Sequence, residues 1–438
     1  MKKNIIFWSV TVALGGLLFG LDTAVISGAE QKIESLWGLS PNLHALAISS
    51  ALIGTIFGAG LGNYPSDLIG RKKTLTIIGI LFFISAIGSG LANNVETFII
   101  FRFMGGLSIG ASSVVAPVYI SEIAPAKHRG KMTMAFQINI VAGILIAYFT
   151  NYLISSLHIE NDWRWMLGIV AIPSLLFVLF LQFTPESPRW LILYKNNINE
   201  AKKILSLTDE NTDEAVKNIL DSASENKTTE RLFTAKYSFP LILAFLLAFF
   251  NQFSGINAVI YYAPRIFEQT GLGEESALLS TTGIGIVNLI STFIGWSLID
   301  KFGRKKLMYI GSVGYIISLA TIAIAFYSKT FYIVPTFIYI FILSHAIGQG
   351  AVIWVFIAEI FPSAVRAKGM SWGCLTHWVF AALITYIFPI INESVGGATI
   401  FAFFSCMMVL QFIFVWKLMP ETKGVSLEEL QKKLIKKN

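Results

Sequence analysis

The chain has 438 residues, of which 55% are hydrophobic and only 13% charged, and its mean hydropathy is +0.67. Soluble domains carry about 25% charged residues, so the composition excludes an ordinary soluble protein and indicates that the bilayer is the solvent for most of the chain. The net charge of +7 comes from short basic segments between apolar runs. Such segments are typical of membrane topology signals and argue against nucleic-acid binding.

In chain order, twelve apolar runs are long enough to span a bilayer, which takes about 20 residues of helix. The first run follows Met1-Lys2-Lys3 and resembles a signal peptide, but no small-residue cleavage motif follows it and Asp22 interrupts it. We therefore expect it to be retained. The predicted spans are residues 5–28, 44–66, 75–93, 97–122, 131–154, 164–184, 239–263, 277–299, 306–327, 331–360, 370–391 and 399–418.

A polar stretch at 185–238 separates the first six spans from the last six. It holds helical patterns at 199–206 and 213–222, which predict short amphipathic helices rather than an independent domain. The expected organisation is an N-terminal six-helix bundle (1–184), a cytoplasmic linker with short helices (185–238), a C-terminal six-helix bundle (239–419) and a cytoplasmic tail (420–438).

The two halves repeat the same motifs about 235 residues apart, which is hard to obtain by chance. This repeat predicts a duplicated all-α membrane domain, the architecture of many secondary transporters. The matching pairs are Asp67 with Asp300, Arg71 with Arg304, Glu122 with Glu359, Pro185-Glu186 with Pro420-Glu421, and Gly20-Leu21-Asp22 with Gly255-Ile256-Asn257.

Basic residues gather in alternate loops, at 67–74, 123–131, 300–306 and 361–369, whereas the intervening short loops carry few. Cytoplasmic loops carry the excess of Lys and Arg. We therefore expect these four loops and both termini to be cytoplasmic.

Asp22 and Arg102 are the two charges inside the spans of the first half, where ionisable groups are costly and mark function. Asp22 lies 19 residues after Lys3, and Arg102 lies 20 residues before Glu122. At about 1.5 Å per residue both charges lie at similar depth and could pair. A carboxylate that alternates between a buried cation and water suits proton coupling. The alternatives are a static ion pair, or an Arg102 that only reaches the outer interface.

Acidic residues accompany the bases at the cytoplasmic ends of both repeats. Carboxylates and Arg side chains can form bidentate networks there, and a network present in one state only acts as a latch. The alternative is plain snorkelling of basic side chains. The predicted latch residues are Asp67, Arg71, Glu122, Arg129, Glu186 and Arg189, and Asp300, Arg304, Glu359, Arg366 and Glu421.

Amides and aromatic side chains also occur within the spans. Amides that converge on a central cavity suit a ligand rich in hydroxyls, because each amide both donates and accepts hydrogen bonds. Each residue also has a plainer explanation, as an interhelical hydrogen bond or as core packing. The set is Gln137, Asn251, Gln252, Asn257, Tyr261, Tyr262, Asn288, Trp354 and Trp378.

Motifs of enzymes and metal sites are absent from the sequence. There is no G-x-x-x-x-G-K-[ST] loop and no H-E-x-x-H pair, the five histidines are scattered, and Cys374 and Cys406 lie in apolar runs. We expect no cofactor, no metal and no catalytic residues. Gly105, Gly106 and Gly110 predict close helix packing rather than phosphate binding.

In combination, these motifs resemble the sugar porters of the major facilitator superfamily over essentially the whole chain. The closest likeness is to bacterial proton-coupled xylose and glucose symporters. The resemblance rests on Gly15-Gly16-Leu17-Leu18-Phe19-Gly20-Leu21-Asp22, Gly62 with Asp67 and Gly70-Arg71-Lys72, Asp300 with Gly303-Arg304-Lys305, Pro117-Val118-Tyr119-Ile120-Ser121-Glu122 with Arg129-Gly130, Pro185-Glu186-Ser187-Pro188-Arg189-Trp190-Leu191 and Pro420-Glu421-Thr422-Lys423-Gly424.

The resemblance implies twelve helices in two bundles that rock about a central sugar site. It implies a monomeric, multi-pass protein of the cytoplasmic membrane whose partners are a monosaccharide, protons and the lipid bilayer. Asp22 matches the acid of proton-coupled members and Arg102 its cationic partner. The implied sugar-contacting positions are Phe19, Gln137, Ile144, Asn251, Gln252, Asn257, Tyr262, Asn288, Trp354 and Trp378.

Several residues depart from the family pattern and leave the sugar open. Asn251 replaces the first Gln of a usual pair, Gln349 lies where a Gly-Pro segment is common, and His377 stands in place of an amide. Ile144 is Gln in some xylose-type members, and Leu68 replaces an Arg. A proton-coupled importer is the favoured function. The alternatives are a passive facilitator of the same fold, a non-transporting sugar sensor, and a drug or polyol exporter.

Overall fold

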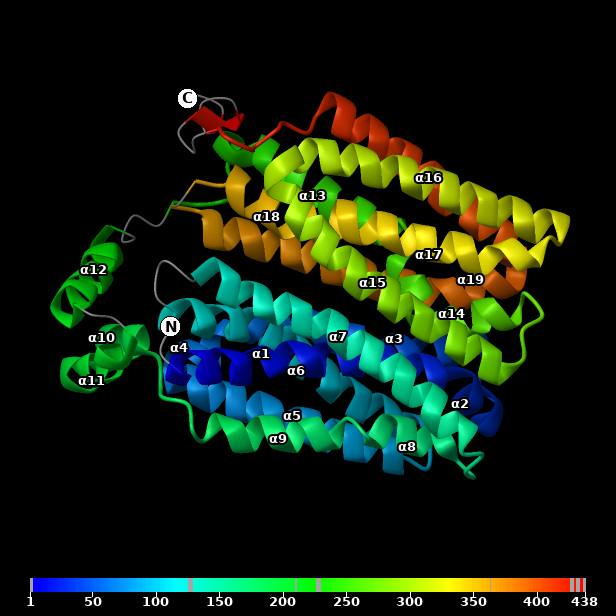
Figure 1. The fold of residues 1–438 in the computed structure, drawn as a ribbon, viewed down its shortest axis with the longest axis horizontal. Helices are drawn as coiled ribbons and strands as arrows, with labels where there is room; N and C mark the ends of the chain where they lie inside the picture. Colours follow the sequence, from blue (N-terminus) through cyan, green and yellow to red (C-terminus); the bar gives the residue numbers. More distant parts are fainter. Residues whose placement is uncertain are drawn as a thin grey trace. The chain divides into compact units, whose positions relative to one another are not determined.

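A computed structural model describes residues 3–124, 129–208, 211–225, 230–362, 364–425, 429–430 and 434–435. Every regular element in these ranges is helical (Figure 1). Within the described ranges, eleven helices are long and apolar enough to cross a membrane, which confirms the all-α membrane fold class. Eleven rather than twelve are found because the last two predicted spans form one continuous element, α19 (Arg366–Lys417).

Helix α19 is two spans joined without a loop. Its 52 residues would measure about 78 Å if straight, more than twice the thickness of the hydrocarbon layer. Gly396 interrupts it with a φ of 76° and a ψ of 163°, a conformation that only glycine adopts readily. The chain therefore turns back at Gly396, between the predicted spans 370–391 and 399–418.

The contacts between residues divide the chain into two compact units. Unit 1 contains residues 1–29, 50–147 and 158–229, and unit 2 contains residues 30–49, 148–157 and 230–438. Two short pieces of the first repeat therefore belong to the same unit as the second repeat. The division of the chain into bundles, linker and tail remains a prediction.

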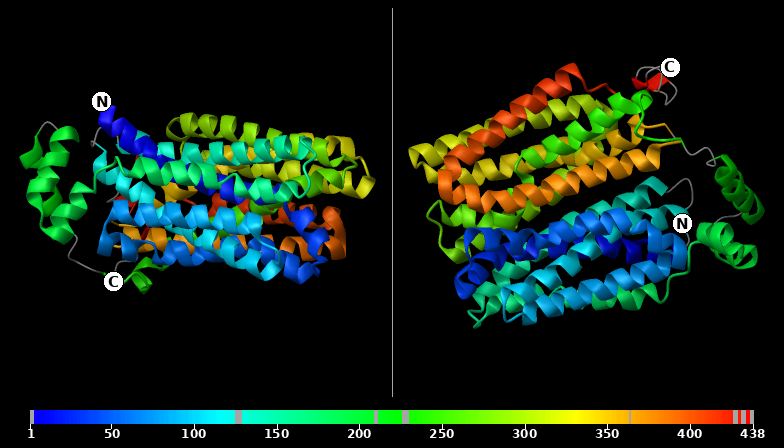
Figure 2. Two further views of the ribbon diagram at one scale, coloured as in Figure 1. Left: turned by 90° about the horizontal axis from the view of Figure 1, so that it is seen from below. Right: turned by 180° about the vertical axis from the view of Figure 1, so that it is seen from behind.

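Unit 1 is built from long helices that run alongside one another, with three short helices beyond their ends (Figure 2). The expected helical patterns of the linker lie in α11 and α12, and α10 precedes them as an unpredicted third helix. The elements are α1 (Lys3–Val25), η1 (Ile26–Gly28), α3 (Pro41–Leu61), α4 (Asn63–Ile69), α5 (Arg71–Leu91), α6 (Val95–Ile123), α7 (Arg129–Ser156), α8 (Asp162–Gly168), α9 (Ala171–Leu181), α10 (Pro188–Lys195), α11 (Ile198–Thr208) and α12 (Thr212–Glu225).

Unit 2 contains the remaining elements, together with the first residues of α3 and the last of α7. Span seven is broken between α13 and α14 at Gly255, which has a φ of 85°. Span ten contains a π-helical turn, η4, of the kind often found at functional sites. The elements are α2 (Glu30–Trp37), η2 (Ala235–Tyr237), α13 (Ser238–Phe253), α14 (Ile256–Glu268), α15 (Glu274–Phe302), α16 (Arg304–Ser328), η3 (Phe331–Ile333), α17 (Val334–His345), η4 (Ala346–Gly350), α18 (Ala351–Ile360) and α19.

Glycines let α3 and α6 approach until backbone touches backbone. A Cβ on Gly106 would lie 1.8 Å from the carbonyl oxygen of Ala51, and a Cβ on Gly110 would lie 2.2 Å from that of Thr55. Close approach of this kind holds membrane helices together where the hydrophobic effect gives no drive. The predicted role of these glycines in helix packing is thus confirmed.

We predict that Gly106→Ala lowers the unfolding temperature of the purified protein in detergent, at a cost of about 1–3 kcal/mol for overpacking. Gly60 is the matched control, because it lies in α3, the helix that Gly106 of α6 packs against, and a Cβ there meets nothing within 4 Å. Gly60→Ala should be neutral or slightly stabilising, since alanine is the better helix former. Equal melting temperatures for the two variants would contradict the close approach.

Candidate functional site

Asp22 of α1 and Arg102 of α6 lie together in unit 1, as their estimated depths predicted. One Arg102 nitrogen, Nη1, lies 2.9 Å from Asp22 Oδ1, and Nη2 donates to the Asp22 carbonyl oxygen at 3.0 Å. Both residues are 1% exposed. Asp22 Oδ2 and Arg102 Nε have no hydrogen-bond partner among the described residues. The pair is thus buried away from water, and one oxygen of the Asp22 carboxylate, Oδ2, makes no hydrogen bond among the described residues.

Three predicted amides form one cluster in unit 2, where span seven breaks. Asn257 donates to Gln252 Oε1 at 2.6 Å, and Gln252 donates to Asn251 Oδ1 at 2.8 Å. Gln252 Nε2 also lies 3.2 Å from a ring nitrogen of His377, whose ring packs 5.1 Å from that of Trp354. Four polar side chains and an indole therefore converge here, and one of them is His377, which the sequence marked as a departure from the family pattern.

The amide cluster continues into a buried chain that was not predicted. Gln349, in the π-helical turn η4, accepts from Asn251 at 3.5 Å and donates to Gln411 at 2.8 Å, and Gln411 donates to Ser312 at 2.8 Å. Gln349, Gln411 and Ser312 are fully buried. The presence of several amides in apolar runs was the available signal, but nothing in the sequence orders them into a chain.

The other predicted sugar contacts are distributed between the two units. Tyr262 is buried away from the amides, since its hydroxyl donates to the Thr385 carbonyl at 3.0 Å and its ring stacks on Phe388. Asn288 is half-buried on α15, and Trp378, next to His377, is 7% exposed. The members in unit 1 are the half-buried Phe19 and Gln137 and the buried Ile144.

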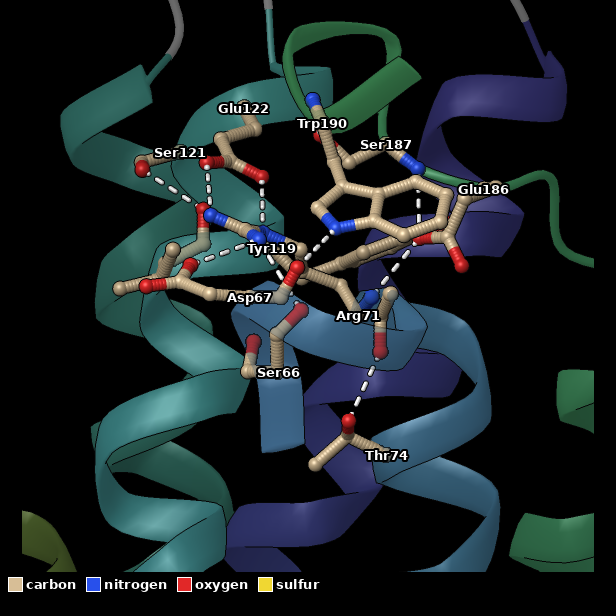
Figure 3. Close-up of polar contacts among 12 residues, drawn as sticks. Ser66, Asp67, Arg71, Thr74, Tyr119, Ser121, Glu122, Glu186, Ser187 and Trp190 are labelled. Carbon is tan, nitrogen blue, oxygen red and sulfur yellow. Dashed lines mark hydrogen bonds and ion pairs between the residues drawn. The ribbon is translucent and has the colours of Figure 1, made fainter. Parts of the chain in front are cut away.

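Arg71 is the centre of the predicted latch in the first repeat (Figure 3). Its Nε and Nη2 donate to the two oxygens of Glu122 at 3.0 and 3.2 Å, and Nη1 lies 2.9 Å from Asp67 Oδ1. Trp190 of α10 closes the cluster by donating to the Asp67 carbonyl at 2.8 Å. Arg71 and Glu122 are each 8% exposed, so this bidentate pair is largely shielded from water.

Glu186 caps the start of α5 from 115 residues away. Its Oε1 accepts the backbone N–H groups of Arg71 at 2.9 Å and Lys72 at 3.1 Å, which are donors that a helix start leaves unpaired. A negative charge there also complements the helix dipole. Gly70, with a φ of 102°, makes room, since a Cβ would lie 2.3 Å from Glu186 Oε2. Burial raises the pKa of the Glu186 carboxyl, against the opposing effect of these N–H groups and Arg71.

The second repeat builds the same arrangement in unit 2. Arg304 forms a bidentate pair with Glu359 at 3.2 and 2.8 Å, and Glu421 accepts the backbone N–H groups of Arg304 and Lys305 at the start of α16. Gly303, with a φ of 85°, leaves room for the Glu421 carboxylate as Gly70 does for Glu186. Asp300 is 86% exposed and lies 3.5 Å from Arg304, so its contact is weak.

One predicted latch residue, Arg366, does not pair with the carboxylate expected in the second repeat. Arg366 donates to the Phe361 carbonyl at 3.2 Å, while Glu359 pairs with Arg304 instead. Arg189 is half-buried at the start of α10. The side chain of Arg129 lies outside the described residues.

A fourth ionic cluster was missed, namely Glu30, Glu34, His44 and Arg265 in unit 2. The sequence does hold a signal for it. Glu30 and Arg265 are 235 residues apart, the spacing of the repeat, so they occupy equivalent positions eight residues after Asp22 and Asn257.

The comparisons with known proteins agree with this geometry. A family model described as "Sugar (and other) transporter" matches residues 8–434. The chain belongs to the sugar porter family. It is therefore a transport protein with many membrane-spanning helices, as predicted from the resemblance.

Individual relatives cover nearly the whole chain. The arabinose-proton symporter of Bacillus subtilis is 39% identical over 99% of this chain and 95% of its own length. The D-xylose-proton symporter of Escherichia coli K12 is 36% identical over 97% and 94%. The inward-open structure of the E. coli xylose transporter XylE matches with a TM-score of 0.87 at 34% identity, covering 98% of this chain and 99% of that one.

We predict that Arg71→Gln destabilises the protein by about 3–5 kcal/mol, because it leaves the shielded Glu122 carboxylate without its partner. Lys73→Gln is the matched control, since it removes a positive charge from an exposed side chain two residues away. The measurement is the thermal unfolding temperature of the two purified variants. If the two temperatures are equal, Arg71 acts only as a topology signal.

Proposed function

We propose that this protein is a secondary active transporter that imports a monosaccharide together with protons. The observation that carries the proposal is the sealed Asp22–Arg102 pair, whose Oδ2 atom has no hydrogen bond among the described residues. A proton on that oxygen neutralises the carboxylate and removes its attraction for Arg102. The pair therefore supports a conformational step coupled to proton binding.

The amide cluster of unit 2 supports a sugar as the substrate. Gln252, Asn251 and Asn257 satisfy one another through donors and acceptors that a hydroxyl group can replace one for one. The Trp354 ring beside His377 offers an apolar face for the C–H surface of the sugar. Relatives named for arabinose, D-xylose and glucose transport favour a pentose or hexose, namely xylose, glucose or a similar sugar.

The proposed cycle is alternating access between two six-helix bundles. With the outer side open, Asp22 binds a proton and releases Arg102, and the sugar binds Gln137 and the span-seven amides. Trp354 then closes over it, the Arg71 and Arg304 networks open, and both solutes leave inward. The protein acts as a monomer in the bilayer of the cytoplasmic membrane, with the basic loops and both termini on the cytoplasmic side.

We predict that Asp22→Asn abolishes accumulation of the sugar against a gradient but retains sugar exchange. The measurement is uptake of labelled xylose, glucose, galactose and arabinose into proteoliposomes, with and without an imposed inward proton gradient. Glu160→Gln, at an exposed loop position, is the control and should accumulate sugar as the unmodified protein does. Equilibration that ignores the gradient in the unmodified protein would make this a passive facilitator, and loss of binding in Asp22→Asn would make Asp22 a structural residue.

A further inference from the structure

The cluster of Glu30, Glu34, His44 and Arg265 joins α2, α3 and α14 within unit 2. Arg265 forms a bidentate pair with Glu30 at 2.9 and 2.7 Å and also bonds Glu34. His44 Nε2 lies 3.0 Å from Glu30 Oε2, and His44 Nδ1 lies 3.8 Å from Glu34 Oε1. The Glu30 and His44 side chains are fully buried, which makes the balance of charge critical here.

Negative charge exceeds positive charge around His44 when its ring is neutral. The T-shaped ring contact of Tyr262 adds no charge, and Arg265 is the cation that pairs with Glu30 and Glu34, the two carboxylates that His44 faces. Further out, Lys32 pairs with Glu274 at 2.7 Å, and Glu268 interacts with Glu30. The groups that these contacts connect are thus four carboxylates (Glu30, Glu34, Glu268 and Glu274) and two cations (Lys32 and Arg265).

The geometry of His44 indicates which ligand would correct this imbalance. Neither ring nitrogen makes a hydrogen bond of good geometry with the described residues, although both face carboxylate oxygens. A divalent cation fits poorly here, because Arg265 already binds both carboxylates and would set a fixed positive charge against it. A proton on His44 places a donor toward each carboxylate without displacing Arg265.

The position of the cluster links it to the opening of the transporter. His44 lies 18 residues before Gly62, the residue that follows α3, hence about 27 Å from the end of α3 that leads to the basic loop at 67–74. In the proposed orientation that is the outer side. The cluster connects α2 and α3 of the first repeat to α14 of the second, and Tyr148 of α7 adds a hydrogen bond to the Ile260 carbonyl at 2.9 Å. Access from outside requires these contacts to separate.

We propose that His44 is a second proton-binding site, which takes up a proton when the outer ends of the two repeats close on each other. In the closed cluster both ring nitrogens of His44 face carboxylate oxygens, so a proton there supplies a donor toward Glu30 and Glu34 that separation of the helices would remove. By linkage, acid shifts the protein toward the outer-closed state. This role is separate from that of Asp22, and it rests on the proposed function only for the orientation of the spans.

The ionisation of Glu30 fits this proposal. Burial alone would raise the pKa of its carboxyl, but the contacts from His44 and Arg265 outweigh burial, and the pKa lies below its usual value. A carboxyl with a lowered pKa contributes to the closed state above its ordinary pKa and loses that contribution as the pH falls through the lowered one. Glu30 therefore stays charged near neutral pH and keeps its attraction for a proton on His44.

The test is the distance between spin labels at Asn42→Cys and Ser276→Cys, two exposed positions beside the cluster on the first and second repeats, in lipid nanodiscs without sugar. Cys374 and Cys406 are replaced by Ser. Between pH 8 and pH 5.5 we expect the ratio of closed to open populations to rise about tenfold, a size typical of coupling between sites. Asp22→Asn should keep this rise.

Two variants decide whether His44 is responsible. His44→Gln should remove the pH dependence. Glu34→Gln should reduce it strongly while His44 is kept, because one of the carboxylates that attract the proton is then neutral, and Glu34 is exposed enough to tolerate the change. A rise that survives in His44→Gln would overturn the proposal. So would a rise that disappears in Asp22→Asn, or closure produced by Zn²⁺ at pH 8 but not by acid.

The same measurement separates this inference from the proposed function. The distances report closure without substrate, so a passive facilitator would still show the acid-driven shift. Conversely, a proton-driven symporter that lacks the shift would leave the Asp22 mechanism intact and refute the role of His44 alone.

Discussion

A charge that is kept from water needs an opposite charge within a few ångströms, and the ionic clusters of this protein meet that requirement. Asp22 pairs with Arg102 inside the spans, and Arg71 pairs with Glu122 where they end. Removing one member without replacing it would cost several kcal/mol. Movement between states therefore has to exchange partners, by a proton, by water or by another side chain, and this makes the states discrete.

Much of the architecture can be predicted from composition and from the spacing of residues along the chain. Hydropathy located the spans, and the helix rise of about 1.5 Å per residue placed Asp22 and Arg102 at one depth. The repeat predicted that Arg304 and Glu359 would copy Arg71 and Glu122, and they form the same bidentate pair. Such features depend on composition and spacing, which need no knowledge of side-chain packing.

The remaining features arise from contacts between distant segments. The role of Glu186 as a helix cap depends on Gly70 adopting a positive φ, and its acidic character alone suggested only an ion pair. The hydrogen bond from Gln349 to Gln411 begins in the π-helical turn η4, which hydrophobic periodicity does not predict. Arg366 was predicted to belong to the latch of the second repeat, but it donates to the Phe361 carbonyl, while Arg304 binds the Glu359 carboxylate.

The contact of Glu30 with Arg265 has a consequence for how a duplicated chain could arise. Equivalent positions of two copies that touch each other are what a self-complementary dimer interface produces at its two-fold axis. In an ancestor with identical halves, such a position would set a residue against its own copy, and two glutamates or two arginines there would repel. Fusion of the halves into one chain releases this constraint. The opposite charges at this position form an ion pair that two identical halves could not make.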